Sequence, residues 1–264
     1  MLELAAIGVA ASLAAGCMTG LGGAMVAFGG PPSERRHNLL MGFAAGVMIA
    51  AAFFSLIIPG IERAQMTGSS RPVAAAMVIG AVLLGAMAMA QLGRLIELAT
   101  AGRPGFEGKR TIKALSGEQH RIALFVIAVT LHNIPEGTAV AVSFMSGDLQ
   151  LGWATTLGIG IQNIPEGMAV AAALSTLGWS PMRCMLAALA TGLIEPVGGL
   201  IGVAIVQTSM AMLPWALGFS AGAMLFVVMA DIIPQASRRI EHGSATPALM
   251  AGLAVMMFLD VTLG

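Results

Sequence analysis

Two copies of one short polar motif hold the residues in this chain that are best suited to chemistry. The first reads HNIPEG, from His132 to Gly137, and the second reads QNIPEG, from Gln162 to Gly167. In each copy the first residue and the glutamate are four positions apart, so both side chains lie on one face of a helix. Imidazole nitrogen with carboxylate and amide oxygens suits Zn²⁺, Fe²⁺ and Mn²⁺ better than Cu⁺. The motifs therefore predict a metal site.

Three glutamates, Glu136, Glu166 and Glu195, fall in the middle of apolar stretches. A charged side chain at the centre of a bilayer helix costs at least roughly 2.5–3.5 kcal/mol. The stretches that hold these glutamates contain no Lys or Arg near the middle to neutralise them. Either the carboxyl groups are protonated, or they share a cation that enters and leaves. The neighbouring amides of Asn133 and Asn163 favour the cation.

The composition indicates that helices surrounded by lipid position these residues. Of the 264 residues 57% are hydrophobic and 10% are charged, whereas an average soluble domain has about 25% charged residues. The net charge is zero, which provides no basic field for nucleic acid. We therefore expect an all-α membrane protein whose surroundings are the lipid bilayer, and no nucleic-acid partner.

Eight stretches are long and apolar enough to cross a bilayer, which takes about 20 mostly apolar residues. Together they predict a single transmembrane domain over residues 1–264, with one longer connector at about 94–121 as the only plausible soluble segment. The expected spans are 4–28, 39–60, 73–93, 122–146, 151–177, 184–207, 213–236 and 246–263.

The basic residues predict the orientation, because Lys and Arg accumulate in cytoplasmic loops. Eleven of the thirteen fall in the odd-numbered loops, which include the connector at about 94–121, and only Arg63 and Arg71 fall in the even-numbered loops. This asymmetry places the long connector in the cytoplasm and both termini outside it. An even number of spans agrees with that arrangement.

Two internal repeats relate distant parts of the chain. The motif copies lie in the expected spans four and five, which a short connector joins as an antiparallel hairpin, so His132–Glu136 and Gln162–Glu166 meet at the same depth. Further apart, GFAAGVM at Gly42–Met48 matches GFSAGAM at Gly218–Met224 in five of seven positions. The loop charges make these two spans run in opposite directions. Such an inverted repeat is typical of transporters that are built around a midplane site.

On these residues the chain resembles the ZIP family of divalent metal transporters, and most closely its GufA-like branch. The resemblance rests on HNIPEG and QNIPEG in consecutive spans and covers essentially all eight spans. It implies eight transmembrane helices, with helices 1–3 and 6–8 related by inversion around a 4–5 hairpin. It also implies a homodimer that moves metal toward the cytoplasm, and we expect it in the plasma membrane, which is the inner membrane of a bacterium.

The resemblance further implies which residues bind and guide the metal. Glu136 and Glu166 would bridge two ions if two bind side by side. Some relatives carry an acid at the position of Asn163, and the neutral amide here argues against a tightly held second ion. For Met48, ligation and simple packing both stay open, because the chain has 20 methionines. The implied ligands are His132, Asn133, Glu136, Gln162, Asn163, Glu166, Glu195 and Met48, and the implied pathway residues are Ser55, Glu62, Asp231 and Asp260.

The function that these features favour is transport of Zn²⁺, with Fe²⁺, Mn²⁺ and Cd²⁺ as further substrates, without a bound cofactor and without enzyme activity. An intramembrane metal-dependent hydrolase is the alternative, because a His and Glu metal site also activates water. Against it, the chain has no HExxH motif, and an inverted repeat is hard to explain in an enzyme. A purely structural membrane protein leaves the three mid-span glutamates unexplained.

Overall fold

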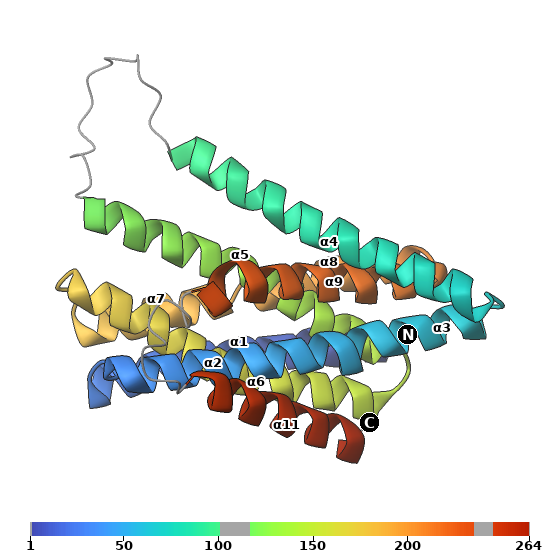
Figure 1. Cartoon of the computed structure of the whole chain (residues 1–264), viewed down its shortest axis with the longest axis horizontal. Helices are drawn as coiled ribbons and strands as arrows, with labels where there is room; N and C mark the ends of the chain where they lie inside the picture. Colours follow the sequence, from blue (N-terminus) through green and yellow to red (C-terminus); the bar gives the residue numbers. More distant parts are fainter. Residues whose placement is uncertain (1, 101–116, 235–244, 264) are drawn as a thin grey trace.

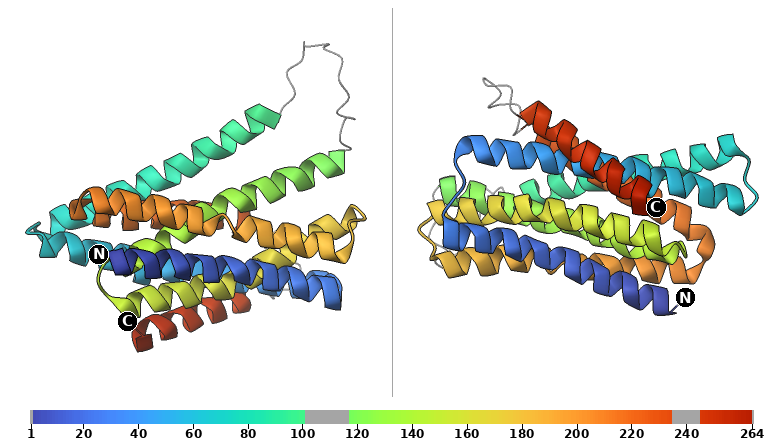
Figure 2. Two further views of the ribbon diagram at one scale, coloured as in Figure 1. Left: turned by 180° about the vertical axis from the view of Figure 1, so that it is seen from behind. Right: turned by 90° about the horizontal axis from the view of Figure 1, so that it is seen from below.

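The computed structural model describes residues 2–100, 117–234 and 245–263, and every regular element in these residues is a helix. The predicted all-α class is therefore confirmed. Figures 1 and 2 show long helices that run roughly along one axis, with both described ends of the chain at the same end of the bundle. The elements are α1 (Leu2–Gly29), α2 (Glu34–Ala50), η1 (Ala51–Ile57), α3 (Ile58–Met66), α4 (Arg71–Thr100), α5 (Gly117–Met145), α6 (Leu149–Thr176), α7 (Pro181–Gly192), α8 (Glu195–Thr208), η2 (Met210–Met212), α9 (Leu213–Val227), η3 (Val228–Ile232) and α11 (Ala245–Leu263).

Seven helical segments in the described residues are long and apolar enough to cross a membrane. They correspond to seven of the eight expected spans. Two of them are composite, since α2, η1 and α3 form Glu34–Met66, and α7 and α8 form Pro181–Thr208. The expected fifth span, 151–177, falls on α6, which is not one of the seven. With 28 residues α6 is about 42 Å long, but its QNIPEG motif lowers its mean hydropathy.

A tight turn joins the two helices that carry the motifs. After α5 ends at Met145, Gly147 has a φ of 83°, a left-handed conformation that glycine adopts without strain. Asp148 then caps α6, because its side-chain oxygen accepts hydrogen bonds from the backbone N–H of Gln150 at 3.0 Å and of Leu151 at 3.1 Å. As a result α5 and α6 form the antiparallel hairpin that the short connector predicted.

Two helices change their winding partway along. α2 continues into the π-helical segment η1, in which the N–H of Ile58 donates to the carbonyl of Phe53. α9 continues into the π-helical segment η3, in which the N–H of Ile233 donates to the carbonyl of Val228. Short π-helical segments are rare and are frequently found at functional sites. Each follows shortly after one of the two matching GFxAGxM stretches, so a repeated sequence precedes a repeated backbone feature.

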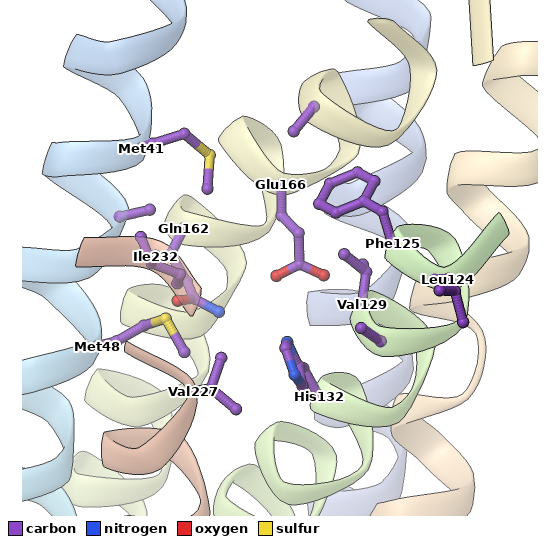
Figure 3. A pocket seen from close by; sticks show the side chains of 13 residues that line it. Met41, Met48, Leu124, Phe125, Val129, His132, Gln162, Glu166, Val227 and Ile232 are labelled. Carbon is purple, nitrogen blue, oxygen red and sulfur yellow. The ribbon is translucent and has the colours of Figure 1, made fainter. Parts of the chain in front are cut away.

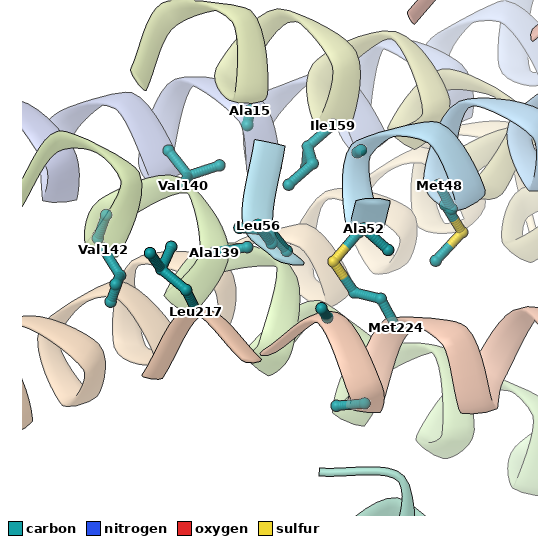
Figure 4. Packing of buried hydrophobic residues seen from close by; sticks show 14 of the residues in the cluster. Ala15, Met48, Ala52, Leu56, Ala139, Val140, Val142, Ile159, Leu217 and Met224 are labelled. Atoms are coloured by element: carbon teal, nitrogen blue, oxygen red, sulfur yellow. The ribbon is translucent and has the colours of Figure 1, made fainter. Parts of the chain in front are cut away.

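A packed apolar layer fills the bundle on one side of the motifs. The side chains of Leu56, Val140, Ile159 and Leu217 are completely buried and meet between η1, α5, α6 and α9 (Figure 4). Val140 lies one turn beyond Glu136, toward the end of the bundle where the chain termini lie. The layer therefore separates the motif residues from that end.

Glycine lets α1 approach the helices around the motifs closely. α1 crosses α7 where Gly16 meets Gly192, and a Cβ added to either glycine would collide with the carbonyl oxygen of the other. α1 also lies against α6 at Gly22, where an added Cβ would collide with the carbonyl oxygen of Ile164. Such close backbone approach at small residues is typical of helix packing in membranes. It fixes α1, α6 and α7 relative to one another.

Candidate metal site

A cavity of about 250 Å³ lies between α2, α5, α6 and α9, and four of the predicted ligands line it. His132 of α5 and Glu166 of α6 point toward each other across this space, with Gln162 beside them and Met48 of α2 on the facing wall (Figure 3). His132 and Glu166 are half-buried, and the remaining described lining is mostly apolar. The cavity thus collects an imidazole, a carboxylate, an amide and a thioether in an otherwise apolar space. We call these four residues the cavity half of the site.

The other four predicted ligands, Asn133, Glu136, Asn163 and Glu195, lie behind the cavity and are 0% exposed. We call them the buried half of the site. Gln162 connects the two halves, because its Nε2 donates to Oε1 of Glu136 at 2.5 Å and to Oδ1 of Asn163 at 3.2 Å. The structure therefore brings all eight predicted ligands into one cluster, but it divides them into two groups with different surroundings.

The two motif asparagines tie the hairpin to the helices beside it. Nδ2 of Asn133 donates to the carbonyl oxygen of Thr191 at 2.8 Å, and Nδ2 of Asn163 donates to the carbonyl oxygen of Ala15 at 2.8 Å. Nδ2 of Asn163 also donates to Oε1 of Glu195 at 2.6 Å. Each asparagine therefore uses its NH₂ group to hold α7 or α1 in place. This structural role was not foreseen from the sequence, which suggested ligand oxygens only.

Seven buried side-chain nitrogen or oxygen atoms lack a hydrogen-bond partner within the described part of the chain. A buried polar atom without a partner costs about 1–3 kcal/mol, and folded proteins keep few of them. Five of the seven are oxygens of the predicted ligands, and a cation placed among them would satisfy several at once. These five are Oδ1 of Asn133, Oε2 of Glu136, Oε1 of Gln162, Oε1 of Glu166 and Oε2 of Glu195.

The side chains of His132 and of the three glutamates do not surround a single point in the described structure. Among the residues described, no three His, Cys, Asp or Glu side chains stand close enough to hold an ion by themselves. Amides lie between the carboxylates, since Gln162 is bonded to Glu136 and Asn163 to Glu195. Glu136 can offer an ion its Oε2, which has no partner in the described structure, while its Oε1 accepts from Gln162.

Three of the four predicted pathway residues, Ser55, Glu62 and Asp260, lie outside the described lining of the cavity. Ser55 of η1 is buried, and its Oγ donates to Oδ1 of Asp260 on α11 at 2.9 Å. Glu62 is exposed on α3. The side chain of Asp231 lies outside the described residues. Neither Ser55, Glu62 nor Asp260 belongs to the cavity lining, as far as the described residues define it, and Leu56 of the apolar layer directly follows Ser55.

Three further residues, of which Met41 lines the cavity, were not singled out from the sequence. Met41 lines the cavity together with Met48, and their spacing of seven residues on one helix was a usable signal. Thr19 Oγ1 and Ser220 Oγ are the remaining two buried atoms without a partner in the described structure. Neither hydroxyl belongs to a metal-binding motif, so the sequence alone gave no reason to choose them.

Comparison with known proteins decides the family. A family model described as ZIP Zinc transporter matches residues 103–260. The chain belongs to the ZIP zinc transporter family. The zinc transporter GufA of Myxococcus xanthus is 42% identical over 259 residues, which cover 97% of this chain and 99% of that protein. The zinc transporter ZIPB of Bordetella bronchiseptica is 42% identical over 263 residues (98% and 81%), and the human zinc transporter ZIP11 is 33% identical over 322 residues (94% and 94%).

These similarities confirm the predicted resemblance to the family and to its GufA-like branch. The ZIP family is a family of transporters rather than of enzymes, which agrees with the prediction that this chain is not an enzyme. The intramembrane hydrolase is therefore not favoured.

Proposed function

We propose that this protein transports Zn²⁺ across a membrane and that the ion binds in the cavity between His132 and Glu166. The observation that carries the proposal is the group of five unpartnered ligand oxygens in the described structure, two of which belong to Gln162 and Glu166 and so to the cavity that His132 lines. A nitrogen of His132, the carboxylate of Glu166 and Oε1 of Gln162 would hold the ion first, and Glu136 would join through its unpartnered Oε2. The relatives that match nearly the whole chain are named zinc transporters, which supports zinc as the substrate. The same donor set also suits Fe²⁺ and Mn²⁺, and the sulfur of Met48 suits Cd²⁺.

We infer that α6 crosses the membrane too, which makes eight spans. Its length of 28 residues is sufficient, and it runs antiparallel to α5 and in close contact with α1. Both described ends of the chain lie at one end of the bundle (Figure 2), as an even number of crossings requires. The polar motif that lowers the hydropathy of α6 faces the interior of the bundle rather than lipid, since Gln162 and Asn163 are buried.

We also propose the inverted repeat of helices 1–3 and 6–8 around the 4–5 hairpin. The hydrogen bonds of the two motif asparagines support it, because their partners are separated in sequence by the same distances as the repeated stretches. Asn163 lies 30 positions after Asn133, and the two carbonyl groups that accept their hydrogen bonds, those of Thr191 and Ala15, lie 176 positions apart. The two GFxAGxM stretches are also 176 positions apart. A pseudo-twofold axis that exchanges α1 with the α7–α8 segment and α5 with α6 would exchange these two hydrogen bonds.

Helix packing follows the same offsets. A Cβ added to Gly22 would collide with the carbonyl oxygen of Ile164, and a Cβ added to Gly198 would collide with the carbonyl oxygen of Ile134. Gly198 lies 176 positions after Gly22, and Ile164 lies 30 positions after Ile134. Four independent contacts thus support one symmetry relation between the two halves of the chain.

The cavity, in this proposal, faces the cytoplasm, and the metal moves toward it. From the motif residues the cavity lining extends through Met41 and Phe125, toward the end of the bundle with most of the described arginines, which include Arg35 and Arg183. Lys and Arg accumulate on the cytoplasmic side. The apolar layer closes the opposite side, where both termini would lie outside the cytoplasm. The described conformation would therefore be one that releases metal inward.

Other features of the expected protein stay predictions. These are the homodimer, the location in the plasma membrane and the soluble cytoplasmic loop in an otherwise single transmembrane domain over residues 1–264. For the loop, expected at about 94–121, α4 continues to Thr100 and α5 begins at Gly117, so both ends of that range are helical. Residues 101–116 lie outside the described structure.

Zinc uptake by proteoliposomes tests the proposed function. Vesicles that contain the purified protein and an internal zinc-sensitive dye should take up Zn²⁺ faster than vesicles without protein. The Glu166→Ala variant, reconstituted in equal amount, should behave like the empty vesicles. A wild-type protein that is folded and reconstituted but moves no divalent metal would refute the transport proposal. Zinc-dependent cleavage of a membrane peptide by the same sample would then favour the hydrolase.

A further inference from the structure

Thr19 of α1 is 0% exposed, and its hydroxyl has no hydrogen-bond partner among the residues that the structure describes. A threonine inside a helix commonly donates its hydroxyl to a backbone carbonyl one turn earlier. The other buried threonines of the described chain, Thr155, Thr156 and Thr191, all do so at 2.7–2.8 Å. Thr19 is the exception and therefore needs a specific explanation.

The carbonyl four residues before Thr19, the position that Thr155 and Thr156 use in their own helix, is already occupied. That carbonyl belongs to Ala15, four residues earlier, and it accepts the helical N–H of Thr19 itself. It also accepts Nδ2 of Asn163 at 2.8 Å. Because a carbonyl oxygen has two lone pairs, both are used. The asparagine of the QNIPEG motif thus leaves the Thr19 hydroxyl available for another partner.

The position of Thr19 corresponds to that of Glu195 in the other half of the molecule. Glu195 lies 176 positions after Thr19, which is the offset that relates the two halves. The two residues also pack against the glycines that end the two motif copies. A Cβ added to Gly167 would collide with the carbonyl oxygen of Thr19, and a Cβ added to Gly137 would collide with the carbonyl oxygen of Glu195. Each residue therefore lies directly beside one motif.

The side chains of Thr19 and Glu195 correspond as well. A Cβ added to Gly16 would lie 3.4 Å from Oε1 of Glu195, and a Cβ added to Gly192 would lie 2.7 Å from Oγ1 of Thr19. Gly192 directly follows Thr191, whose carbonyl oxygen holds Asn133. The hydroxyl of Thr19 is therefore placed on the Asn133 side of the site, as the Glu195 carboxylate is placed on the Asn163 side.

We propose that Thr19 is a further residue of the transport site and contacts the hydrated ion as the neutral counterpart of Glu195. The inference rests on the zinc transport proposed above. Oγ1 of Thr19 and Oδ1 of Asn133, both buried and without a partner in the described structure, add oxygen atoms on this side without adding a fourth carboxylate. Transport requires binding that is strong enough to admit an ion and weak enough to release it. Thr19 keeps this side of the site weak.

Three substitutions in the full-length protein test the inference. Thr19→Val nearly keeps the shape and removes the hydroxyl, so zinc affinity should fall about 2- to 10-fold, the equivalent of about one net hydrogen bond. Thr19→Ser keeps the hydroxyl and should bind zinc like the wild type. Thr19→Asp places a carboxylate opposite Glu195, so the protein should retain more zinc after desalting. Competition with a zinc chelator measures affinity, and elemental analysis measures retained zinc.

A thermal-unfolding measurement without metal separates a site role from a structural role. Because the hydroxyl is buried without a partner, Thr19→Val should leave the melting temperature unchanged or raise it, even though zinc binding weakens. The matched control is Thr156→Val, which removes a hydroxyl that donates to Gly152 at 2.7 Å. It should lower the melting temperature and leave zinc affinity unchanged.

The outcomes distinguish this inference from the proposed function. If the wild type neither binds nor moves zinc, the proposed function is wrong and the role of Thr19 is wrong with it. If the wild type transports zinc and Thr19→Val binds it with unchanged affinity, only the role of Thr19 is wrong. A Thr19→Val protein that binds zinc normally but melts at a lower temperature would show a structural role instead.

Discussion

The cavity half and the buried half of the site use the same kinds of side chain in different surroundings. In the cavity half, His132 and Glu166 are half-buried and face a space of about 250 Å³. In the buried half, Glu136 and Glu195 are 0% exposed, and an amide N–H donates to each of them. A carboxylate that faces open space is suited to exchange an ion, whereas a carboxylate bonded to an amide holds helices together. The surroundings, rather than the residue type, therefore assign the roles.

The largest expected effect comes from removing the charge in the cavity half. Glu166→Gln should reduce zinc flux by more than about 100-fold, because even the partners of metal ligands are worth roughly 10–100-fold. Glu195→Gln should reduce flux less, since a glutamine oxygen still accepts the hydrogen bond from Asn163. Dye-based uptake by proteoliposomes compares the two variants, with Glu3→Gln on the exposed surface of α1 as the control. Equal losses in both variants would contradict the division into two halves.

Asn163→Asp should strengthen metal binding in the buried half and weaken its contacts between helices. Asn163 donates to Ala15 and to Glu195, and an aspartate donates to neither. The new carboxylate also faces Glu195, and two neighbouring carboxylates favour a shared cation. We expect a lower melting temperature without metal, roughly one additional zinc ion retained per protein, and slower maximal flux.

Elemental analysis and unfolding curves of wild type and Asn163→Asp, measured side by side, test this expectation. Unchanged zinc content together with unchanged flux would show that position 163 does not limit the number of bound ions. The implied ligand role of Asn163 should then be given up.

The sequence predicted the helical class and the clustering of the ligands because both depend on local patterns. Long apolar stretches indicate helices, and a short connector forces α5 and α6 to pair, so HNIPEG and QNIPEG had to meet. The division into two halves depends instead on which neighbouring helix each face of the hairpin meets. Gln162 and His132 occupy equivalent positions in the two motifs, yet His132 faces the cavity while Gln162 also reaches Glu136. No local pattern encodes that difference.

The role that we propose for Thr19 could not be read from the sequence for the same reason. It depends on the carbonyl of Ala15, which the side chain of Asn163 from a distant helix occupies. It also depends on Thr19 and Glu195 making equivalent contacts, although threonine and glutamate are different residue types.

Hydropathy alone is misleading for α6. A helix at the centre of a membrane bundle can be less apolar than its neighbours, because its polar face is turned toward other helices.

The smallest expected effect concerns the sulfur atom in the cavity half. Met48→Leu conserves volume and should lower affinity by less than about tenfold, and the loss should be larger for Cd²⁺ than for Zn²⁺ because the thioether is a soft ligand. Met41→Leu, in the same cavity and on the same helix, is the matched control and should change neither affinity. Competition titrations with both metals give the ratio. Equal losses for the two metals, or none, would indicate that Met48 only packs.

The location of the bound ion tests the central claim most directly. Crystals of the wild-type protein grown with Zn²⁺ can be measured on both sides of the zinc absorption edge, and the difference map shows zinc alone. The strongest peak should lie in the cavity, within bonding distance of His132 and Glu166, and it should disappear in crystals of Glu166→Gln. A strongest peak beside Ser55 and Asp260, or one that persists unchanged in the variant, would contradict the proposal that the cavity half binds the transported ion.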